Sequence, residues 1–202
     1  MNEIITNDYQ YVDLGLPSGT LWAACNVGAQ RPTEIGLYFQ WGDTKGYKKN
    51  CEEQPFSQYS YKFTSHDVGV SRYTKYNPID NKFILDLEDD AAHAIMGGSW
   101  RMPTSKQFEE LSNNVKFHRF DKFVILKSKR NNRQMILPFN GYYINNTQYS
   151  CGNNTLLWGC ERENINGRTE YVSYLCGSGT GGIHTFTDRY FGFNVRGVIN
   201  TK

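Results

Sequence analysis

Hydrophobic and polar positions along the chain predict many short strands and two short helices. Alternating apolar and polar residues, and short runs of β-branched and aromatic residues, are typical of strands. The strands predicted on this basis are Tyr9–Leu14, Leu21–Val27, Leu37–Trp41, Ser99–Met102, Lys116–His118, Phe123–Ser128, Gln134–Pro138, Leu156–Cys160, Tyr171–Cys176, Gly182–Thr187 and Phe191–Val198. We expect the last of these strands to pair near the first.

The stretch Leu87–Thr104, LEDDAAHAIMGGSWRMPT, carries the clearest helix signals. Asp89 and Asp90 stand where carboxylates stabilise the first turn of a helix, and the alanines after them favour helix until a Gly-Gly pair ends it. Thr104, followed three residues later by Gln107, forms a capping box for a second helix. The predicted helices are Glu88–Ile95 and Ser105–Leu111.

The region from Asp43 to Asn81 has no sustained periodicity and predicts a long loop. Ordered loops of this length are uncommon and are often functional. We expect the loop to be a packed excursion that is covered by its own aromatic side chains. These are Phe56, Tyr59, Tyr61, Phe63, Tyr73 and Tyr76.

With 202 residues, of which 39% are hydrophobic and 15% aromatic, the chain can form one domain with a substantial core. The net charge of +2 argues against nucleic-acid binding, which depends on neutralising phosphates, and the basic turn Lys129–Arg133 is expected to be exposed. No stretch approaches the roughly 20 apolar residues that span a bilayer, so we expect no membrane insertion. The opening MNEIITND lacks the apolar centre of a signal peptide, so we expect neither classical export nor an anchor.

Motifs for catalysis or cofactor binding are weak. Gly177–Gly182 matches the dinucleotide-binding pattern GxGxxG, but strand-like residues follow it where a helix is needed, which favours a hairpin loop. The acids from Asp86 to Asp90 could offer oxygen ligands to calcium, although helix capping explains them better. The four histidines form no recognisable catalytic group. We therefore expect no metal, no cofactor and no catalytic residue.

The cysteines form neither a CxxC pair nor a metal-ligand spacing, and we interpret them as reduced thiols. Cys160 and Cys176 could pair across adjacent strands under oxidising conditions, which the sequence leaves open. The five cysteines are Cys25, Cys51, Cys151, Cys160 and Cys176.

Four segments, spanning roughly residues 9 to 199, carry specific motifs: Val12–Ala23, Leu87–Thr104, Leu137–Tyr143, and Trp158 followed by Tyr190–Val198. They resemble the motifs VDLGLPSGTLWA, LEDDAA…GGSWRMPT, LPxxGY and W-S-S…YGxxVRPV of a repeat-rich family in gut Bacteroidetes and Fibrobacter, often called the major paralogous domain. Three departures affect local packing. Met96 stands where a tryptophan is common, Gly159-Cys160 replaces two serines, and Gly197 replaces a proline.

This resemblance implies an α+β fold of the C-type-lectin-like class, in the subtype of the formylglycine-generating enzymes (sulfatase-modifying factors), with two short helices, small antiparallel sheets and long covered loops. Proteins diversified by retroelements use the same scaffold to display variable surfaces. The enzymes of the subtype use paired cysteines, so a cysteine oxidase is one alternative, although their cysteine motif has no residue-by-residue match here. The calcium and sugar motifs of classical C-type lectins, EPN or QPD with a later WND, are absent.

Tyrosine and asparagine enrichment in the last third of the chain is the strongest functional signal. Nine asparagines stand between Asn131 and Asn166, interleaved with aromatic residues. Such residues give contact area and adaptable hydrogen bonds at low entropic cost, as in paratopes, whereas the structural alternative is that they fill turns and pack a β-rich core. The predicted ligand-binding surface comprises Tyr142, Tyr143, Asn145, Asn146, Tyr149, Asn153, Trp158, Arg162, Tyr171, Tyr174, His184, Arg189 and Tyr190.

These features predict a non-catalytic recognition or display domain over residues 9–202, preceded by an N-terminal tether of residues 1–8. Its partner is expected to be a host cell-surface glycan or protein, with a phage fibre or capsid decoration that attaches to a Bacteroides-type host as its setting. We expect it at the virion surface, or secreted or at the cell surface if a signal peptide was removed. The alternatives are a structural virion component that contacts other virion proteins through its aromatic face, and the cysteine oxidase. A second copy of the chain is a further expected partner.

Overall fold

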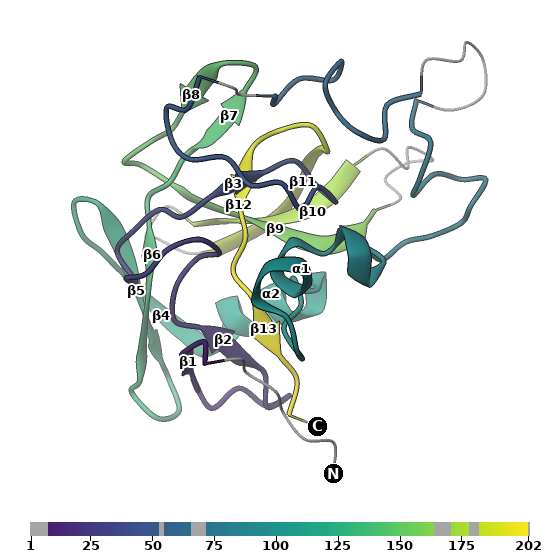
Figure 1. The fold of residues 1–202 in the computed structure, drawn as a ribbon. Helices are drawn as coiled ribbons and strands as arrows, with labels where there is room; N and C mark the ends of the chain where they lie inside the picture. Colours follow the sequence, from purple (N-terminus) through teal and green to yellow (C-terminus); the bar gives the residue numbers. More distant parts are fainter. Residues whose placement is uncertain (1–7, 53–54, 66–71, 164–170, 178–181, 202) are drawn as a thin grey trace.

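A computed structural model describes residues 8–52, 55–65, 72–163, 171–177 and 182–201. These residues form an α+β structure of small sheets with two α-helices, as predicted (Figure 1). The helical elements are the 3-10 turn η1 (Leu87–Asp89), α1 (Ala91–Met96) and α2 (Ser105–Asn114). Within this described part of the chain, none of the helices is long and apolar enough to cross a bilayer.

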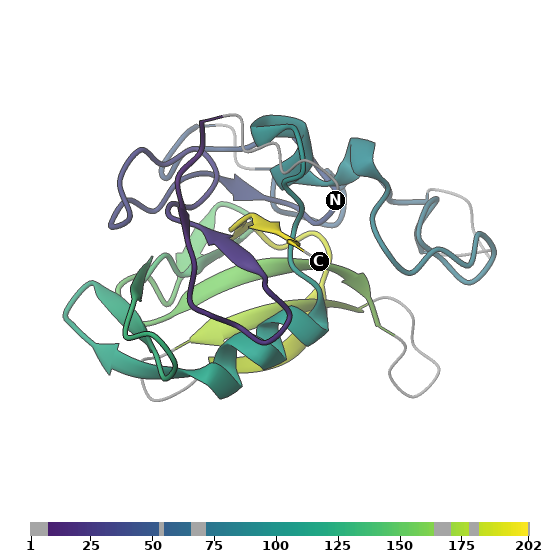
Figure 2. The ribbon, with the colours of Figure 1, turned by 90° about the horizontal axis from the view of Figure 1, so that it is seen from below.

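The largest sheet has the strand order β11-β10-β9-β12-β3. Helix α2 lies against β9, β10 and β11, so it covers one face of this sheet (Figure 2). The central strand β9 is buried along nearly its whole length, because packed elements cover both of its faces. The strands are β3 (Tyr38–Phe39), β9 (Thr155–Arg162), β10 (Tyr171–Gly177), β11 (Gly182–Asp188) and β12 (Phe193–Asn194).

A second sheet joins the two ends of the described chain. In it β2 (Leu21–Ala23) pairs with β1 (Tyr11–Val12) on one side and β13 (Val198–Ile199) on the other. The expected proximity of the first and last strands is therefore confirmed. The single strand predicted at Phe191–Val198 is wrong, because this segment divides into β12 and β13, which belong to different sheets.

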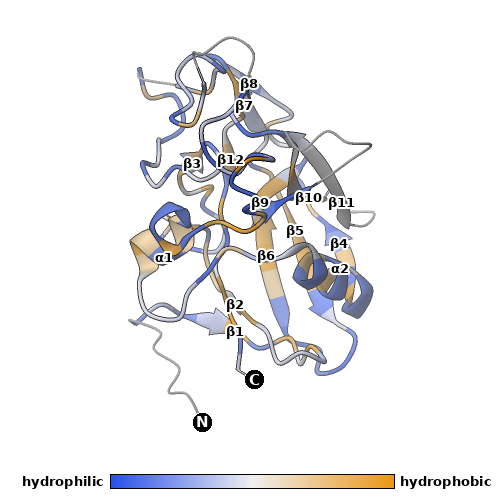
Figure 3. Cartoon of the chain, turned by 90° about the vertical axis from the view of Figure 1, so that its right-hand side faces the viewer, coloured by the Kyte–Doolittle hydropathy of each residue, from blue (hydrophilic) through white to orange (hydrophobic). Residues whose placement is uncertain are grey.

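The remaining strands form a three-stranded meander and a hairpin. The meander consists of β4 (Val115–Arg119), β5 (Phe123–Ser128) and β6 (Gln134–Pro138), and the hairpin of β7 (Tyr142–Ile144) and β8 (Thr147–Tyr149). Burial alternates along β5, so one face of the meander packs on the core and the other faces outward. Figure 3 shows that β5 and β6 are hydrophobic over much of their length and hydrophilic at one end.

The central stretch is organised by side-chain caps. Asp90 caps α1 by accepting from the His93 N–H at 2.9 Å, and its two oxygens also accept from the Met102 N–H at 3.1 and 2.8 Å. The predicted capping box of α2, between Thr104 and Gln107, is confirmed. Two other predictions are wrong. Asp89 lies in η1 and not in the first turn of α1, and Ser99–Met102 forms only one bridge, between Arg101 and Val198, in place of a strand.

The long excursion after β3 is covered by its own aromatic side chains, as predicted. Five of the six residues named for this role are buried. The rings of four of them pack on Trp41 or on one another, and Phe56 packs on Tyr38 and Tyr143. Tyr59 is the exception, since it is 90% exposed. The buried residues are Phe56, Tyr61, Phe63, Tyr73 and Tyr76.

Candidate functional site

Four aromatic side chains form a partly exposed row, which we call the aromatic ribbon: Tyr149, Tyr142, Phe191 and Tyr190. Tyr142 and Tyr149 stand directly opposite each other in the β7–β8 hairpin, and their rings stack with centroids 5.4 Å apart. Tyr142 also stacks on Phe191 at 6.0 Å, and Phe191 meets Tyr190 edge to face at 5.1 Å. Tyr149 is 44% exposed and the other three are half-buried.

The backbone holds the two halves of the aromatic ribbon together. Tyr143 and Gly192 exchange both of their N–H to carbonyl hydrogen bonds, at 3.0 and 2.9 Å, which fixes the 190–192 segment beside β7. Gly192 lies against Phe56 so closely that an added Cβ would be 2.6 Å from its ring. Only glycine fits this approach, so the register of the aromatic ribbon depends on position 192.

Buried aromatic residues support the aromatic ribbon from beneath. Phe56 stacks on Tyr143 at 5.5 Å, and Tyr38 packs edge to face on Tyr143 at 4.8 Å. Gln148 of β8 donates to the Tyr38 hydroxyl at 2.9 Å, and the Asn145 N–H donates to the Phe56 carbonyl at 2.7 Å. The hairpin is therefore held by side-chain and backbone contacts, which limits the entropy that its exposed rings would lose on binding a ligand.

Planar polar groups border the Tyr190 end of the aromatic ribbon. The Arg72 guanidinium lies 5.8 Å from the Tyr190 ring centroid, pairs with Asp188 at 3.3 Å and donates to the Gln58 amide oxygen at 2.9 Å. The side chains of Arg72 and Asp188 are 29% and 25% exposed, so solvent reaches both. Burial and the neighbouring Asp188 carboxylate raise the pKa of Tyr190, which keeps its hydroxyl protonated at neutral pH.

Several residues of the predicted surface do lie at or near this place. Tyr142, Tyr149 and Tyr190 belong to the aromatic ribbon, and the exposed Asn145 and Asn146 form the turn of its hairpin. Two other predicted residues lie outside the aromatic ribbon, one in the loop between β8 and β9 and one on β10. The first, Asn153, is exposed, and the second, Tyr174, is half-buried against Trp158 and Phe193.

Four residues of the predicted surface are buried, and their assignment to an exposed surface is wrong. Tyr143 belongs to the layer beneath the aromatic ribbon. Trp158 is fully buried on β9, where it stacks on Phe193 at 4.1 Å and donates its indole N–H to the Phe39 carbonyl at 2.7 Å. Both faces of β9 are buried, so alternate residues of this strand do not face solvent and Trp158 cannot lie on the surface.

The other two buried residues are arginines that hold the long excursion in place. Arg189 is fully buried and donates to the carbonyl of Tyr76 at 2.7 Å, with its guanidinium 4.3 Å from the Tyr73 ring centroid. Arg162 is 2% exposed, donates to the Lys82 carbonyl at 2.9 Å and lies 4.1 Å from the Phe83 ring centroid. Their charge is thus buried among carbonyls and aromatic faces, which sequence alone does not reveal.

Two predicted residues lie outside the described side chains, and several residues of the site were missed. Tyr171 and His184 stand on β10 and β11, but the structure describes only their backbone. Phe191, Arg72 and Asp188 were not predicted. The signal for Phe191 was present in its neighbour Tyr190, whereas Arg72 is brought to the site by the long excursion and left no local signal.

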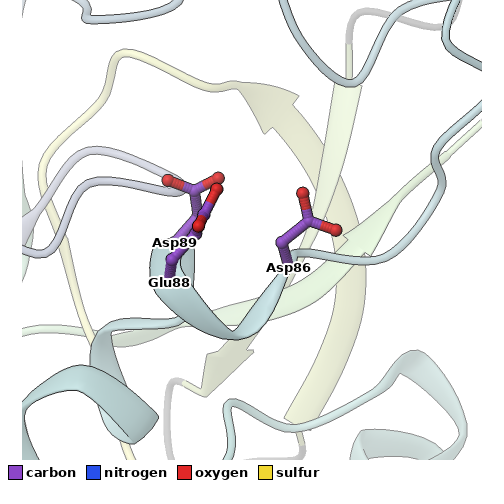
Figure 4. Close-up of side chains that lie close together, drawn as sticks. All are labelled: Asp86, Glu88 and Asp89. Carbon is purple, nitrogen blue, oxygen red and sulfur yellow. The ribbon is translucent and has the colours of Figure 1, made fainter.

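Three carboxylates gather at η1, where the ligand atoms of Asp86, Glu88 and Asp89 lie within 4.8 Å of one another (Figure 4). The Lys75 ammonium reaches all three, at 2.8, 3.1 and 2.5 Å respectively. Lys62 adds a further ion pair to Asp89 at 2.7 Å. A lysine ammonium therefore occupies the position from which a cation would neutralise this cluster, so the calcium alternative has no support from the geometry.

The ion pairs shift the pKa values of this cluster. Hydrogen bonds from Lys75 and Lys82 lower the pKa of Asp86 to about 2. Burial alone would raise the pKa of Asp89, but hydrogen bonds from Lys62, Lys75 and Tyr76 lower it below its ordinary value. Burial likewise opposes the charge on Lys75, yet its carboxylate partners raise its pKa. Asp86, Asp89 and Lys75 therefore stay charged at neutral pH, which is typical of a structural network.

A pocket of about 370 Å³ lies beside α1, and its lining includes Asp90, Arg101 and Cys160. Asp90 uses its oxygens for the backbone N–H groups described above, and burial raises its pKa. Arg101 contacts the His93 ring nitrogen at 2.6 Å and donates to the Gly98 carbonyl at 3.2 Å. These polar groups fix the backbone of the central stretch.

The thiols do not form the pair that the sequence left open. Neither Cys160 nor Cys176 forms a disulfide, and Cys176 stands opposite Leu156 in the β9–β10 register, four residues from Cys160. Pairing of Cys160 with Cys176 across these strands is therefore excluded in this register. Burial raises the pKa of Cys160, so its thiol is protonated at neutral pH and is a poor nucleophile.

No protein-family model, no curated protein and no solved structure matches this chain. The α+β architecture is a property of the structure itself. The resemblance to the major paralogous domain family, and the lectin-like fold that it implies, stay predictions from the sequence motifs.

Proposed function

We propose that this chain is a non-catalytic recognition domain of the C-type-lectin-like class whose aromatic ribbon binds a glycan on a cell surface. The observation that carries the proposal is the partly exposed Tyr142–Tyr149 stack, extended by Phe191 and Tyr190 and supported by buried aromatic residues. A row of partly exposed rings on a fixed base is a large apolar surface with polar hydroxyls at its rim.

The chemistry of the aromatic ribbon suits a sugar polymer. Aromatic faces pack on the C–H faces of sugar rings, while planar groups such as the Arg72 guanidinium and the Asp188 carboxylate hydrogen-bond to adjacent hydroxyls. The row is longer than one ring, so successive sugar units could each find a contact. Weak contacts of this kind become useful when several copies bind one surface, because effective concentration then replaces single-site affinity.

The lectin-like class is supported by the pairing of β13 and β1 with the same strand and by the long excursion covered with its own aromatic residues. A setting in a phage virion that attaches to a bacterial host belongs to the same proposal. The competing role is assembly, in which the aromatic ribbon would be buried against a neighbouring virion protein.

The test is a glycan array printed with bacterial surface polysaccharides, probed with the wild type and with Tyr149→Ala. Tyr149→Ala removes the most exposed ring of the aromatic ribbon, and we expect it to weaken binding by roughly fivefold or more, the value of one aromatic contact. Tyr11→Ala is the matched control, because Tyr11 is 48% exposed, close to the 44% of Tyr149, but lies on β1 in another sheet.

The outcomes separate the alternatives. Loss of glycan binding in Tyr149→Ala with wild-type binding in Tyr11→Ala supports the proposal. Equal glycan binding by both variants overturns the proposal that the aromatic ribbon is the binding site. Absence of glycan binding in the wild type, together with Tyr149-dependent association with a capsid or tail protein, overturns it in favour of assembly.

A further inference from the structure

The β4–β6 meander has a strong excess of positive charge. Residues 115–134 contain seven lysines and arginines and one acid, whereas the whole chain has a net charge of only +2. The remainder of the chain is therefore net negative. A segment that concentrates one sign of charge in this way is a candidate for contact with a partner of the opposite sign.

The strand register places two of these cations directly side by side. Lys116 of β4 pairs with Lys127 of β5, and Lys127 pairs with Gln134 of β6, so the three side chains form one row across the outward face. Like charges directly opposite each other in a sheet are destabilising. Among the described residues no acid pairs with Lys116 or Lys127, so the protein itself does not offset this repulsion.

The same face continues from the cations to apolar and aromatic groups. The next row contains His118, Ile125 and Ile136, in register across the three strands. Beyond it, Phe120 and Phe123 stack with centroids 5.1 Å apart, and Phe120 is 48% exposed. One face of a three-stranded sheet thus offers cations at one end and an aromatic platform at the other.

Four of the other five cations of the meander, all but Lys122, are already engaged. Arg119 donates to the Asn153 carbonyl at 2.9 Å, Lys129 to the Asn113 carbonyl at 2.7 Å and Arg130 to the Gly15 carbonyl at 3.2 Å, and Arg133 pairs with Asp13 at 3.7 Å. Few cations of the meander are therefore available to a ligand. A nucleic acid would need more of them, because proteins that bind DNA contact about 6–10 phosphates. A small set of cations suits a polymer that carries one acidic group on each ring.

We propose that the outward face of the β4–β6 meander binds an acidic polysaccharide. In this arrangement the Lys116–Lys127 pair holds a carboxylate or sulfate, and the Phe120–Phe123 platform packs on a neighbouring sugar ring. An anion between the two ammonium groups relieves their repulsion and makes charge-assisted hydrogen bonds to both. The inference does not depend on the aromatic ribbon, which is formed by the β7–β8 hairpin and residues 190–191.

The experiment measures binding of the full chain to polygalacturonate and to dextran sulfate, with uncharged dextran as the neutral polymer. Lys116→Gln/Lys127→Gln is expected to bind both acidic polymers roughly tenfold or more weakly, because hydrogen bonds to charged groups are lost. The same variant is expected to be as stable as the wild type or more stable at low salt, since it removes the like-charge pair.

A charge-matched control is Lys48→Gln/Lys106→Gln, which removes two exposed lysines from the loop after β3 and from α2. Wild-type binding by this control, with loss of binding in the meander variant, supports the proposal. Equal loss in both variants points to net charge alone and overturns it. Preference for an oligothymidylate or for anionic lipid vesicles over both polysaccharides overturns it as well, in favour of nucleic acid or membrane contact. Because Tyr149→Ala leaves this face intact, failure here is distinguishable from failure of the glycan proposal for the aromatic ribbon.

Discussion

Gly197 packs so closely against Met96 that a Cβ at position 197 would lie 2.9 Å from the methionine sulfur. The same Cβ would lie 2.9 Å from Cε3 of the buried Trp100. Positions 96 and 197 are two of the three places where the chain departs from the motifs that it resembles, with methionine for tryptophan and glycine for proline. The two departures are therefore in contact, and the absence of a side chain at 197 leaves room for the Met96 side chain to fill.

Gly197→Ala is expected to destabilise the fold by about 1–3 kcal/mol, the usual effect of adding a methyl group to a well-packed core. Urea denaturation followed by tryptophan fluorescence measures the change. Met96→Ala in the same chain removes the sulfur and makes space for the new methyl. The double variant should therefore lose less stability than the two single variants added together. Strict additivity would show that residues 96 and 197 do not compete for the same space.

Local signals in the sequence predicted local structure well. Thr104 and Gln107 form the predicted capping box, because this interaction is set by two residues three positions apart. The strand Phe123–Ser128 was predicted with its observed bounds, because its apolar and polar residues alternate and it has one buried face.

What the sequence did not predict depends on contacts between distant segments. Trp158 and Arg189 look like exposed recognition residues, yet Trp158 bonds to Phe39 and Arg189 to Tyr76, more than a hundred residues away in each case. Asp89 looks like a helix-capping residue, but it is drawn into ion pairs with Lys62 and Lys75 of the long excursion. Tyr142, Tyr149 and Tyr190 of the aromatic ribbon were predicted from composition, but Phe191, which stacks on Tyr142, was missed.

Gly192→Ala is expected to weaken both the fold and ligand binding by the aromatic ribbon. An added Cβ would lie 2.6 Å from the Phe56 ring, so Phe56 must move and the layer beneath Tyr142 and Phe191 loses its packing. We expect a loss of about 1–3 kcal/mol in unfolding free energy and a reduced near-ultraviolet circular dichroism signal from the tyrosines. Tyr149→Ala, by contrast, should leave unfolding free energy within about 0.5 kcal/mol of the wild type, as a substitution at an exposed position. Wild-type stability and binding in Gly192→Ala would contradict the role of position 192 as a spacer.

Lys75→Met is expected to lower the unfolding free energy at neutral pH by roughly 2 kcal/mol, because three carboxylates lose their shared cation. Lys48→Met is the control, since Lys48 is exposed and its ammonium has no ion pair among the described residues. Equal stability of the two variants in urea titrations at pH 7 would contradict the network.

The same network predicts how stability depends on pH. The pKa of Asp86 is lowered to about 2 from an ordinary 3.8, so its ion pairs contribute stability that is fully present above pH 4. That stability is lost as the pH falls from about 4 towards 2, and Asp89, whose pKa is also lowered, contributes in the same direction. Urea titrations at pH 6, 4, 3 and 2 should show a smaller acid loss in Lys75→Met than in the wild type. Parallel acid losses in the two proteins would show that Lys75 does not set these pKa values.

Thiol chemistry distinguishes the recognition domain from a cysteine oxidase. In the native protein, Cys151 is exposed, with the Lys49 ammonium 3.2 Å from its sulfur, and should react with iodoacetamide. Cys160 is 5% exposed with a raised pKa and should be alkylated only after unfolding. Mild oxidation should leave Cys160 and Cys176 unlinked, because Cys176 faces Leu156 across the strands. Peptide mass spectrometry after alkylation, with and without urea, measures both outcomes, and Cys151→Ser identifies the fast-reacting thiol. A disulfide between Cys160 and Cys176 in the folded protein, or thiol-dependent oxygen consumption that Cys160→Ser abolishes without unfolding the chain, would contradict this register and favour the enzyme.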